Sequence, residues 1–280
     1  MSSRRIAFLD VDGTLIDHDQ RLAPSAVAAV RGARAAGHLV YICTGRSRAE
    51  ISPEVLDIGF DGVISAGGGF IERDGELLAA HTMPEDAVRE LIAFFAQNDV
   101  EYTLQGYEGV YPSEGVLSRL APMFTARGWD IADASSDMIR LADKFAYRGA
   151  VPLEGIAKAT FFGDSDRTFA TVRDGLGDRF HVVTGTIPYL GHAGGEVSLR
   201  GMNKGAALVE LVGVVGLTAA DAIAIGDGSN DLEMLQVAGV GIAMGNADDV
   251  VKAHADETTT SVHDDGVWTA FVRHGLVQSA

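Results

Sequence analysis

Cysteine and proline are both scarce in this chain, which has one cysteine, Cys43, and seven prolines among 280 residues. A single cysteine cannot close a disulfide within the chain, so we expect the protein to work in a reducing compartment. Few prolines beside 34 glycines indicate many tight turns between regular elements rather than a proline-rich linker. Cys43 lies inside an apolar run, and this pattern predicts a buried core residue.

Long apolar runs are also missing from the sequence. No stretch approaches the ~20 consecutive apolar residues that a membrane-spanning helix requires. Near the amino end, the apolar run 6–9 is too short for the hydrophobic segment of a secretory signal. We therefore predict a soluble, cytoplasmic protein without a membrane partner.

Positive charge is the third shortage, because 22 lysines and arginines stand against 39 acidic residues and give a net charge of −17. A field of that sign repels nucleic acid, so we expect no nucleic-acid partner. It also repels small anions, which could bind only where a metal ion or a few well-placed cations reverse the field locally. The chain itself is expected to be a monomer or a weak homodimer.

What is present is ordinary globular composition, with 47% hydrophobic and 22% charged residues. Apolar runs and helical segments alternate at both ends of the chain, which is typical of βαβ units and a parallel sheet. The expected strands are 6–10, 38–43, 63–66, 222–225 and 240–243, and the expected helices between them are 25–36, 47–56, 203–214 and 231–238.

The middle third of the sequence has a different rhythm. Asp74-Gly75 between apolar flanks predicts a hairpin, and a mixed pattern of helices and strands follows it. We place an α+β insert at 82–186, with a core built from 1–81 and 187–280. The predicted fold class is therefore α/β: a doubly wound, Rossmann-like parallel sheet interrupted by an α+β domain.

Polar side chains stand where the expected parallel strands end. Asp10 and Asp12 follow the first strand, and Thr44-Gly45-Arg46 follows the second. The strand after the insert ends in Gly226-Asp227-Gly228-Ser229-Asn230-Asp231, and Lys204 opens the preceding helix. Ligands bind at the carboxyl ends of such strands, so these groups are predicted to meet at one rim.

Four carboxylates at one rim repel each other unless a cation lies between them. Oxygen-only ligands favour Mg²⁺, which usually takes one or two carboxylates together with a substrate phosphate. A lysine, a hydroxyl and glycine-lined backbone amides complete a phosphate-binding environment. An aspartate there can attack phosphorus and become an aspartyl phosphate, and the aspartate two residues later can serve as general acid and then base.

These motifs, in this order, resemble the four motifs of the haloacid dehalogenase superfamily. More narrowly, the chain resembles the Cof-type phosphatases, class IIB, which carry a cap domain between the second and third motifs. The segments that carry the resemblance are Asp10-Val11-Asp12-Gly13-Thr14-Leu15, Thr44-Gly45-Arg46, Lys204, the run from Ile225 to Met234, and Gly241-Ile242-Ala243-Met244-Gly245-Asn246-Ala247. The resemblance covers both core segments; in the insert it is one of size and placement.

The resemblance implies a role for each matching residue. Asp10 would be the nucleophile and Asp12 the general acid and base. Thr44, helped by the backbone of Gly45, would hydrogen-bond the phosphoryl group. Lys204 would neutralise Asp10 and the phosphate.

The same resemblance implies a magnesium site. Asp227 would bind Mg²⁺ together with Asp10 and the backbone carbonyl of Asp12. Asn230 and Asp231 would orient that set of ligands. Arg46 either faces the phosphate or caps the helix after it, and the sequence favours neither.

One departure from the family concerns the end of the third strand, where many relatives have Asn-Gly and this chain has Ala66-Gly67. A substrate contact made by that asparagine would be absent here. On the cap, Glu196 matches a position that is often acidic in the family. Candidate substrate contacts there are Tyr102, Gln105, Tyr107, His192 and Arg200.

The leading hypothesis is a Mg²⁺-dependent phosphatase that acts on a small phosphorylated metabolite, and the favoured substrate class is a sugar phosphate. A phosphomutase or other phosphotransferase, in which an alcohol replaces water, shares the aspartyl-phosphate step and stays open. A catalytically silent binding protein is the third alternative. The intact set of Asp10, Asp12, Lys204 and Asp227 argues against it.

Overall fold

The computed structural model describes residues 4–126, 145–184 and 191–278. The chain divides into two compact units, a core of Met1–His81 with Met202–Ala280 and a cap of Thr82–Gly201. The start of the cap coincides with the expected residue 82. The expected return to the core at 187 lies outside the described residues, and the return in the structure comes fifteen residues later than that.

The late return has a structural cause, a strand that the sequence pattern did not reveal. This strand, β10 (Gly194–Leu199), pairs antiparallel with β8 (Ile156–Phe162) and β9 (Phe180–Val183), both in the cap. It begins with two glycines and has few apolar residues, so its sequence resembles a loop. Its backbone hydrogen bonds are what assign it to the cap sheet.

The core sheet has the strand order β13-β12-β11-β1-β2-β3-β4-β5. Strands β13 to β3 in that order pair parallel, and the last two pair antiparallel. The strands are β1 (Ile6–Leu9), β2 (Leu39–Cys43), β3 (Gly62–Ser65), β4 (Phe70–Arg73), β5 (Glu76–Ala80), β11 (Ala222–Gly226), β12 (Val240–Ala243) and β13 (Glu257–Thr258). The expected doubly wound parallel core is confirmed.

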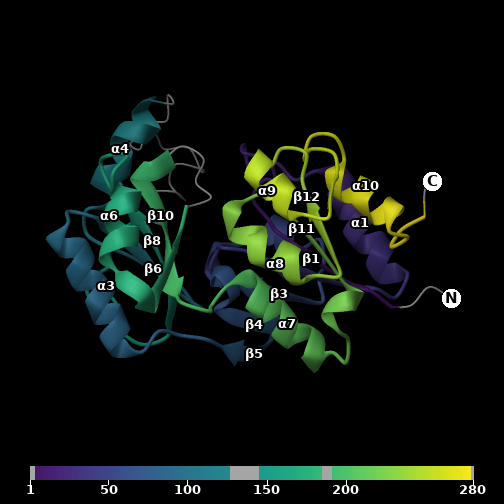
Figure 1. Ribbon diagram of the computed structural model, residues 1–280, viewed down its shortest axis with the longest axis horizontal. Coiled ribbons are helices and arrows are strands. Elements are labelled where there is room, and N and C mark those ends of the chain that lie inside the picture. The colour runs from purple at the N-terminus through teal and green to yellow at the C-terminus, as the bar shows by residue number, and fades with distance from the viewer. Residues whose placement is uncertain (1–3, 127–144, 185–190, 279–280) are drawn as a thin grey trace. The chain divides into compact units, whose positions relative to one another are not determined.

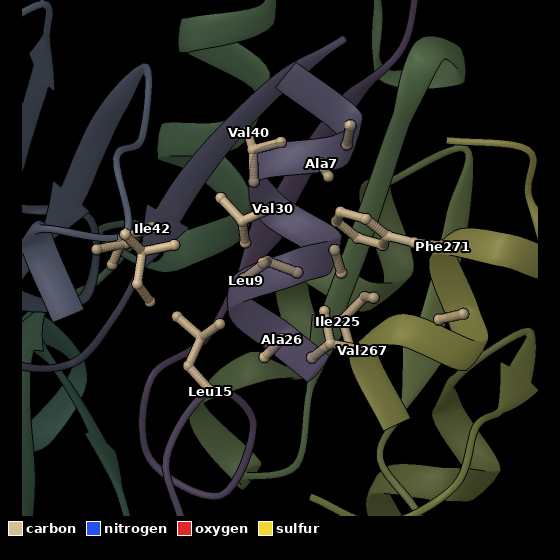
Figure 2. Close-up of a cluster of buried hydrophobic side chains, with 14 of the residues drawn as sticks. Ala7, Leu9, Leu15, Ala26, Val30, Val40, Ile42, Ile225, Val267 and Phe271 are labelled. Atoms are coloured by element: carbon tan, nitrogen blue, oxygen red, sulfur yellow. The ribbon is translucent and has the colours of Figure 1, made fainter. Parts of the chain in front are cut away.

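Helices cover both faces of the core sheet (Figure 1). Helices α1 (Pro24–Ala35) and α10 (Gly266–Arg273) share one apolar cluster with alternate strand residues such as Leu9 and Ile225 (Figure 2). Helices α7 (Lys204–Val214), α8 (Leu232–Val237) and α9 (Asp249–His254) share the other cluster, which includes the buried Cys43. Because successive strand residues point to opposite faces and helices cover both, the parallel strands β1, β2, β11 and β12 carry no charged residue.

Local signals in the first core segment are mostly realised. The β4–β5 hairpin turns at Asp74 and Gly75, whose positive φ values of 52° and 82° suit a two-residue turn. The single helix expected over 47–56 is instead a 3₁₀ turn (Arg48–Glu50) followed by a short helix, α2 (Pro53–Leu56). Pro53 explains the break, because proline disfavours helical backbone in the residue before it.

The cap is an antiparallel sheet with helices packed against it. Its strand order is β7-β6-β8-β10-β9, with β6 at Glu101–Gly106 and β7 at Val110–Pro112. Helices α3 (Glu85–Gln97) and α6 (Thr168–Gly175) pack on the apolar face, and α4 (Val116–Ala126) contacts β6 and β8. Phe95 lies centrally among the aromatic rings of this apolar cluster.

In the described part of the chain, none of the helices combines the length and the apolar character that a membrane crossing requires.

Candidate active site

Three neighbouring parallel strands deliver the first side chains of the site. Asp10 directly follows β1, Thr44 follows β2, and Asp227 follows β11. In the sheet, β1 lies between the other two, so Asp10 is the central residue of the rim. The backbone N–H of Asp10 donates to the carbonyl of Ile225 at 3.0 Å, which holds the end of β1 against β11.

Lys204 reaches this rim from the first turn of α7. Its Nζ donates to Oδ1 of Asp10 at 2.7 Å and to Oδ1 of Asp231 at 2.6 Å, and the side chain is only 1% exposed. Asn203 caps the helix by accepting from the N–H of Ala206 at 2.8 Å, which fixes where α7 begins. The buried ammonium is therefore held in position by both its partners and its helix.

Asp231 is occupied by hydrogen bonds on both oxygens. Oδ1 accepts from Lys204, and Oδ2 accepts from the backbone N–H groups of Asp227 and Gly228 at 3.0 and 2.9 Å. These bonds tie the loop after β11 to the lysine. Asp231 thus orients both Asp227 and Lys204. If its carboxylate turned toward another ligand, it would give up these hydrogen bonds.

Asp227 packs against Gly13, at a position where only glycine fits. A Cβ built on Gly13 would lie 2.1 Å from Oδ2 of Asp227, and Gly13 also has a φ of 77°, so a side chain is excluded on both counts. Oδ1 of Asp227 is buried and has no hydrogen-bond partner among the described residues. One carboxylate oxygen of each of Asp10, Asp227 and Asp231 lies within 4.8 Å of the others.

The pKa values of the site follow from burial and crowding. Burial raises the pKa of Asp10 to about 7 against the attraction of Lys204, and Asp231 and Asp12 add repulsion. Burial raises the pKa of Asp227 to about 8, with further repulsion from Asp10 and Asp231. Burial alone would lower the pKa of Lys204, but the two carboxylates beside it hold that pKa well above its usual value.

Arg46 binds Asp12 and also reaches the end of the 3₁₀ turn that follows it. Its guanidinium donates two hydrogen bonds to Asp12, from Nε to Oδ2 at 2.8 Å and from Nη2 to Oδ1 at 2.6 Å. Nη2 also donates to Oε1 of Gln20 at 2.6 Å, and Nη1 donates to the carbonyl of Glu50 at 3.2 Å. The paired geometry is typical of strong arginine–carboxylate recognition, so Asp12 is held by Arg46 in this structure.

The remaining motif residues are buried at the same strand ends. Thr44 accepts from the N–H of Arg46 at 3.2 Å through its hydroxyl, and Gly45 between them is buried. Both amide atoms of the Asn230 side chain are buried without a hydrogen-bond partner among the described residues. Such atoms are costly unless a polar ligand or water reaches them.

The Ala66-Gly67 departure has a visible local cost. Ala66 has a φ of 49°, a left-handed conformation that L residues other than asparagine and aspartate adopt with strain. Its N–H donates to the carbonyl of Arg46 at 2.6 Å, and Gly67 donates to Thr44 at 3.0 Å. The loop after β3 therefore supports the Thr44 loop through backbone bonds.

Among the cap residues expected to contact substrate, Tyr102 is placed elsewhere. Its ring stacks on Phe95 at 5.4 Å inside the apolar cluster, so the expectation of a substrate contact is wrong for this residue. Period-two alternation along β6 puts it on the helix-covered face. His192 lies beside Phe169, and Arg200 binds Asp178.

Glu196 forms a buried ion pair in the cap. Its Oε2 lies 2.8 Å from Nζ of Lys158, and both side chains are more than nine-tenths buried. The two residues stand on adjacent strands, β10 and β8, and face the side of the sheet opposite Phe161 and Val197. The resemblance to the family indicated an acidic residue at position 196, but it did not indicate that Lys158 would be its partner.

Sequence reasoning also missed a contact of Asn246. This residue lies in the turn after β12, and its Nδ2 donates to the carbonyl of Gly13 at 2.9 Å and to Oδ2 of Asp227 at 3.2 Å. The only signal was its position in a run that resembles the family, which gave no role.

Comparisons with known proteins decide the family. A family model of haloacid dehalogenase-like hydrolases matches residues 7–271, nearly the whole chain. This chain belongs to that family. The curated HMP-PP phosphatase of Escherichia coli O157:H7 (strain EC4115 / EHEC) is 30% identical over 257 residues, which cover 87% of this chain and 85% of the relative.

Solved structures show the same fold over the whole chain. A protein from Geobacillus kaustophilus HTA426 matches with a TM-score of 0.77 at 27% identity and covers 98% of this chain and 100% of its own. A haloacid dehalogenase subclass IIB sugar phosphatase matches with a TM-score of 0.77 at 23% identity, again over 98% of this chain and 100% of its own. The expected recognition, a Cof-type member of the haloacid dehalogenase superfamily, is confirmed.

Proposed function

We propose that this enzyme is a Mg²⁺-dependent phosphatase that hydrolyses a small phosphorylated metabolite through an aspartyl phosphate on Asp10. The observation that carries the proposal is the pairing of Asp10 with the buried Lys204 at the rim formed by β11, β1 and β2. A carboxylate held in place beside a permanent cation is suited to approach an anionic phosphate.

Three properties of the donor set fit a magnesium ion. The cluster of Asp10, Asp227 and Asp231 offers only oxygen atoms, which hard cations prefer. Oδ1 of Asp227 is buried without a hydrogen-bond partner in the described part of the chain, and burial keeps the pKa values of Asp10 and Asp227 near 7 and 8 in the absence of a cation. Asp231 already accepts hydrogen bonds on both oxygens, and Asp10, Asp227 and the Asp12 carbonyl are the proposed ligands.

When bound, Mg²⁺ would supply charge that offsets repulsion between phosphate and carboxylates and would polarise the phosphoryl oxygens. Residues of the chain would orient the nucleophile and the phosphoryl group. Lys204 donates a hydrogen bond to Oδ1 of Asp10, so Oδ2 is the oxygen of this carboxylate that the lysine does not bind. The Thr44 hydroxyl and the Gly45 amide are proposed to orient the phosphoryl group, with Asn230 beside the metal ligands.

In the first step, a carboxylate oxygen of Asp10 attacks phosphorus and the bond from phosphorus to the leaving oxygen breaks. Asp12 donates a proton to that oxygen, so the product leaves as an alcohol. Both Asp12 oxygens are bound to Arg46 in this structure, so donation requires that one of these hydrogen bonds be released.

In the second step, water attacks the phosphorus of the aspartyl phosphate. Asp12 takes the proton from water, the bond between phosphorus and the Asp10 oxygen breaks, and inorganic phosphate leaves. Asp10 is regenerated as a carboxylate and Asp12 is again protonated. The two steps consume one water and release one phosphate for each substrate.

A sugar phosphate is the proposed substrate class, and the name of the E. coli relative adds HMP-PP to the compounds to test. Transfer to an alcohol in place of water remains the second candidate, because both reactions share the first step. Relatives named as phosphatases favour water as acceptor.

A phosphate-release screen over a panel of phosphorylated metabolites tests this proposal. We expect release with Mg²⁺, none with EDTA, and recovery when Mg²⁺ is restored. Adding a simple alcohol and measuring its phosphorylated product separates hydrolysis from transfer. Full activity in EDTA would contradict the magnesium role, and no turnover of any phosphate ester would contradict the phosphatase.

A further inference from the structure

Asn246 connects three loops of the core through one amide. Its Nδ2 donates to the carbonyl of Gly13 at 2.9 Å and to Oδ2 of Asp227 at 3.2 Å. Its Oδ1 accepts from the backbone N–H of Val262 at 2.9 Å. The three partners lie in the loops that follow β1, β11 and β13.

The orientation of the amide is fixed by these partners. A backbone N–H can only donate, so the atom facing Val262 must be the carbonyl oxygen of Asn246. The amino group then faces Gly13 and Asp227, where both neighbours are oxygen acceptors. A flipped amide would place two oxygens against each other at Gly13 and two N–H groups against each other at Val262.

The backbone that carries Asn246 is also held in place. Gly245 donates to the carbonyl of Thr260 at 3.0 Å, and Ala247 donates to Met244 at 3.0 Å. A Cβ on Gly245 would lie 2.7 Å from the backbone nitrogen of Ser261, so the two loops are in close contact. The amide therefore starts from a fixed turn and reaches the site in a defined direction.

We propose that Asn246 is a positioning residue for the metal site, one that fixes Oδ2 of Asp227 to the loop of Gly13. With Oδ2 bound to the amide, the buried Oδ1 of Asp227 is the oxygen presented to a divalent cation. This inference rests on the proposed Mg²⁺ site and adds to it the residue that orients one of its ligands. Hydrogen-bond partners of metal ligands fix the orientation of those ligands and thereby raise metal affinity.

The size of the effect follows from exposure. Asn246 is a solvent-exposed side chain, so water can replace part of what its amide supplies. We therefore expect the lower end of the ~10–100-fold losses of metal affinity that follow loss of such a partner. We predict that a variant without this amide binds the ion more weakly, and that its turnover recovers once the ion is bound.

The experiment measures Mg²⁺ binding to the full chain by isothermal titration calorimetry for the wild type and Asn246→Ala. Asn98→Ala is the matched control, because it also removes an exposed amide, one that donates to the carbonyl of Phe94 in the cap. We expect Asn246→Ala to weaken Mg²⁺ binding about tenfold and Asn98→Ala to leave it unchanged. Asn246→Ser, a smaller change, replaces the alanine variant if that variant does not fold.

Two further readouts separate positioning from a merely structural role. Asn246→Ala should need about tenfold more Mg²⁺ for half-maximal phosphate release while kcat at saturating Mg²⁺ stays close to wild type. The rise in melting temperature on adding a fixed Mg²⁺ concentration should also shrink. A role limited to anchoring the Val262 loop would instead lower the melting temperature equally with and without Mg²⁺, and this result would overturn the inference.

The remaining outcomes are distinguishable. Equal Mg²⁺ affinity in the wild type and Asn246→Ala, both of them folded and active, overturns the inference and leaves the proposed function intact. No Mg²⁺ binding by the wild type contradicts the proposed function itself.

Discussion

The core and the cap each bury a lysine, and the charges around the two lysines differ. Lys204 in the core is 1% exposed and Lys158 in the cap is 2% exposed. Lys158 pairs with Glu196, one positive charge with one negative. Lys204 forms ion pairs with Asp10 and Asp231. A carboxylate oxygen of Asp227 lies within 4.8 Å of an oxygen of each of these two residues.

The difference identifies which buried cluster is built for a ligand. A matched pair can be satisfied within the protein, whereas three carboxylates around one ammonium leave an excess of negative charge in a place shielded from water. The excess sits at the carboxyl ends of parallel strands, where doubly wound folds bind ligands. The core cluster therefore fits the proposed cation, and the cap pair is matched in charge within the protein.

The largest expected effect comes from Asp10→Asn. Removing the attacking oxygen should lower kcat at least about 10⁴-fold, in line with the loss of other enzyme nucleophiles. Folding should survive, because one of the crowded carboxylates is gone and Lys204 keeps Asp231. Steady-state phosphate release with circular dichroism as the folding control measures both; a variant with a tenth of wild-type kcat would rule out Asp10 as nucleophile.

Substituting the two lysines tests the comparison itself. Lys204→Met and Lys158→Met should each lose about 3–5 kcal/mol of stability, because each leaves a buried carboxylate uncompensated. Only Lys204→Met should also lower kcat of the folded protein on a small aryl phosphate, by about 10²–10³-fold. Urea unfolding and turnover separate the two effects.

The cap pair should be replaceable as a unit. Lys158→Met combined with Glu196→Leu should recover most of the lost stability, because a buried pair can give way to apolar residues of similar size. No recovery in the double variant would show that the cap pair, like the core cluster, has a partner beyond its two members.

The raised acids of the core predict a pH effect on stability in EDTA. The pKa of Asp227 is about 8 in the folded protein against 3.8 ordinarily, so the folded state binds the proton more strongly. The free energy of unfolding should therefore fall as pH rises from about 4 to about 8. Asp227→Asn should remove part of that fall, on the order of a few kcal/mol at about 1.4 kcal/mol per pKa unit.

Urea titrations at pH 5.5 and 8.5 measure this difference between the wild type and Asp227→Asn. The histidines titrate in both proteins and cancel in the comparison. Parallel pH profiles for the two proteins would mean that Asp227 is not crowded in the metal-free site.

The smallest expected effect belongs to Arg46→Ala. It frees Asp12 from two hydrogen bonds without removing it, so kcat should fall only about tenfold, well below the ~10²–10⁴-fold that general acid–base catalysis contributes. Asp12→Ala is the comparison and should lose more. An Arg46→Ala loss as large as that of Asp12→Ala would assign Arg46 a direct role in the reaction.

The core could be predicted from sequence because its signals are local and repeated. Apolar strands followed by polar turns gave the sheet, and Asp10, Thr44 and Asp227 met at one rim because parallel strands end on one edge. The strand β10 was missed because only its partners β8 and β9 make it a strand. The pairing with β8 joins residues far apart in the sequence, such as Glu196 and Thr160.

The sequence predicted which side chains gather at this rim, but it did not predict their contacts. The grip of Arg46 on Asp12 and the link from Asn246 to Asp227 depend on side-chain directions across loops, which residue spacing does not encode. Tyr102 failed for a related reason, since which face of β6 packs on α3 is set by the whole cap sheet.

The central claim is that Asp10 becomes phosphorylated during turnover. The most direct test quenches the enzyme with acid while substrate is being consumed, reduces it with borohydride, and locates the product by peptide mass spectrometry. Reduction converts an aspartyl phosphate to homoserine, so homoserine is expected at position 10 of the wild type and absent from Asp10→Asn. Homoserine at another aspartate, or none at position 10 during active turnover, would contradict the account.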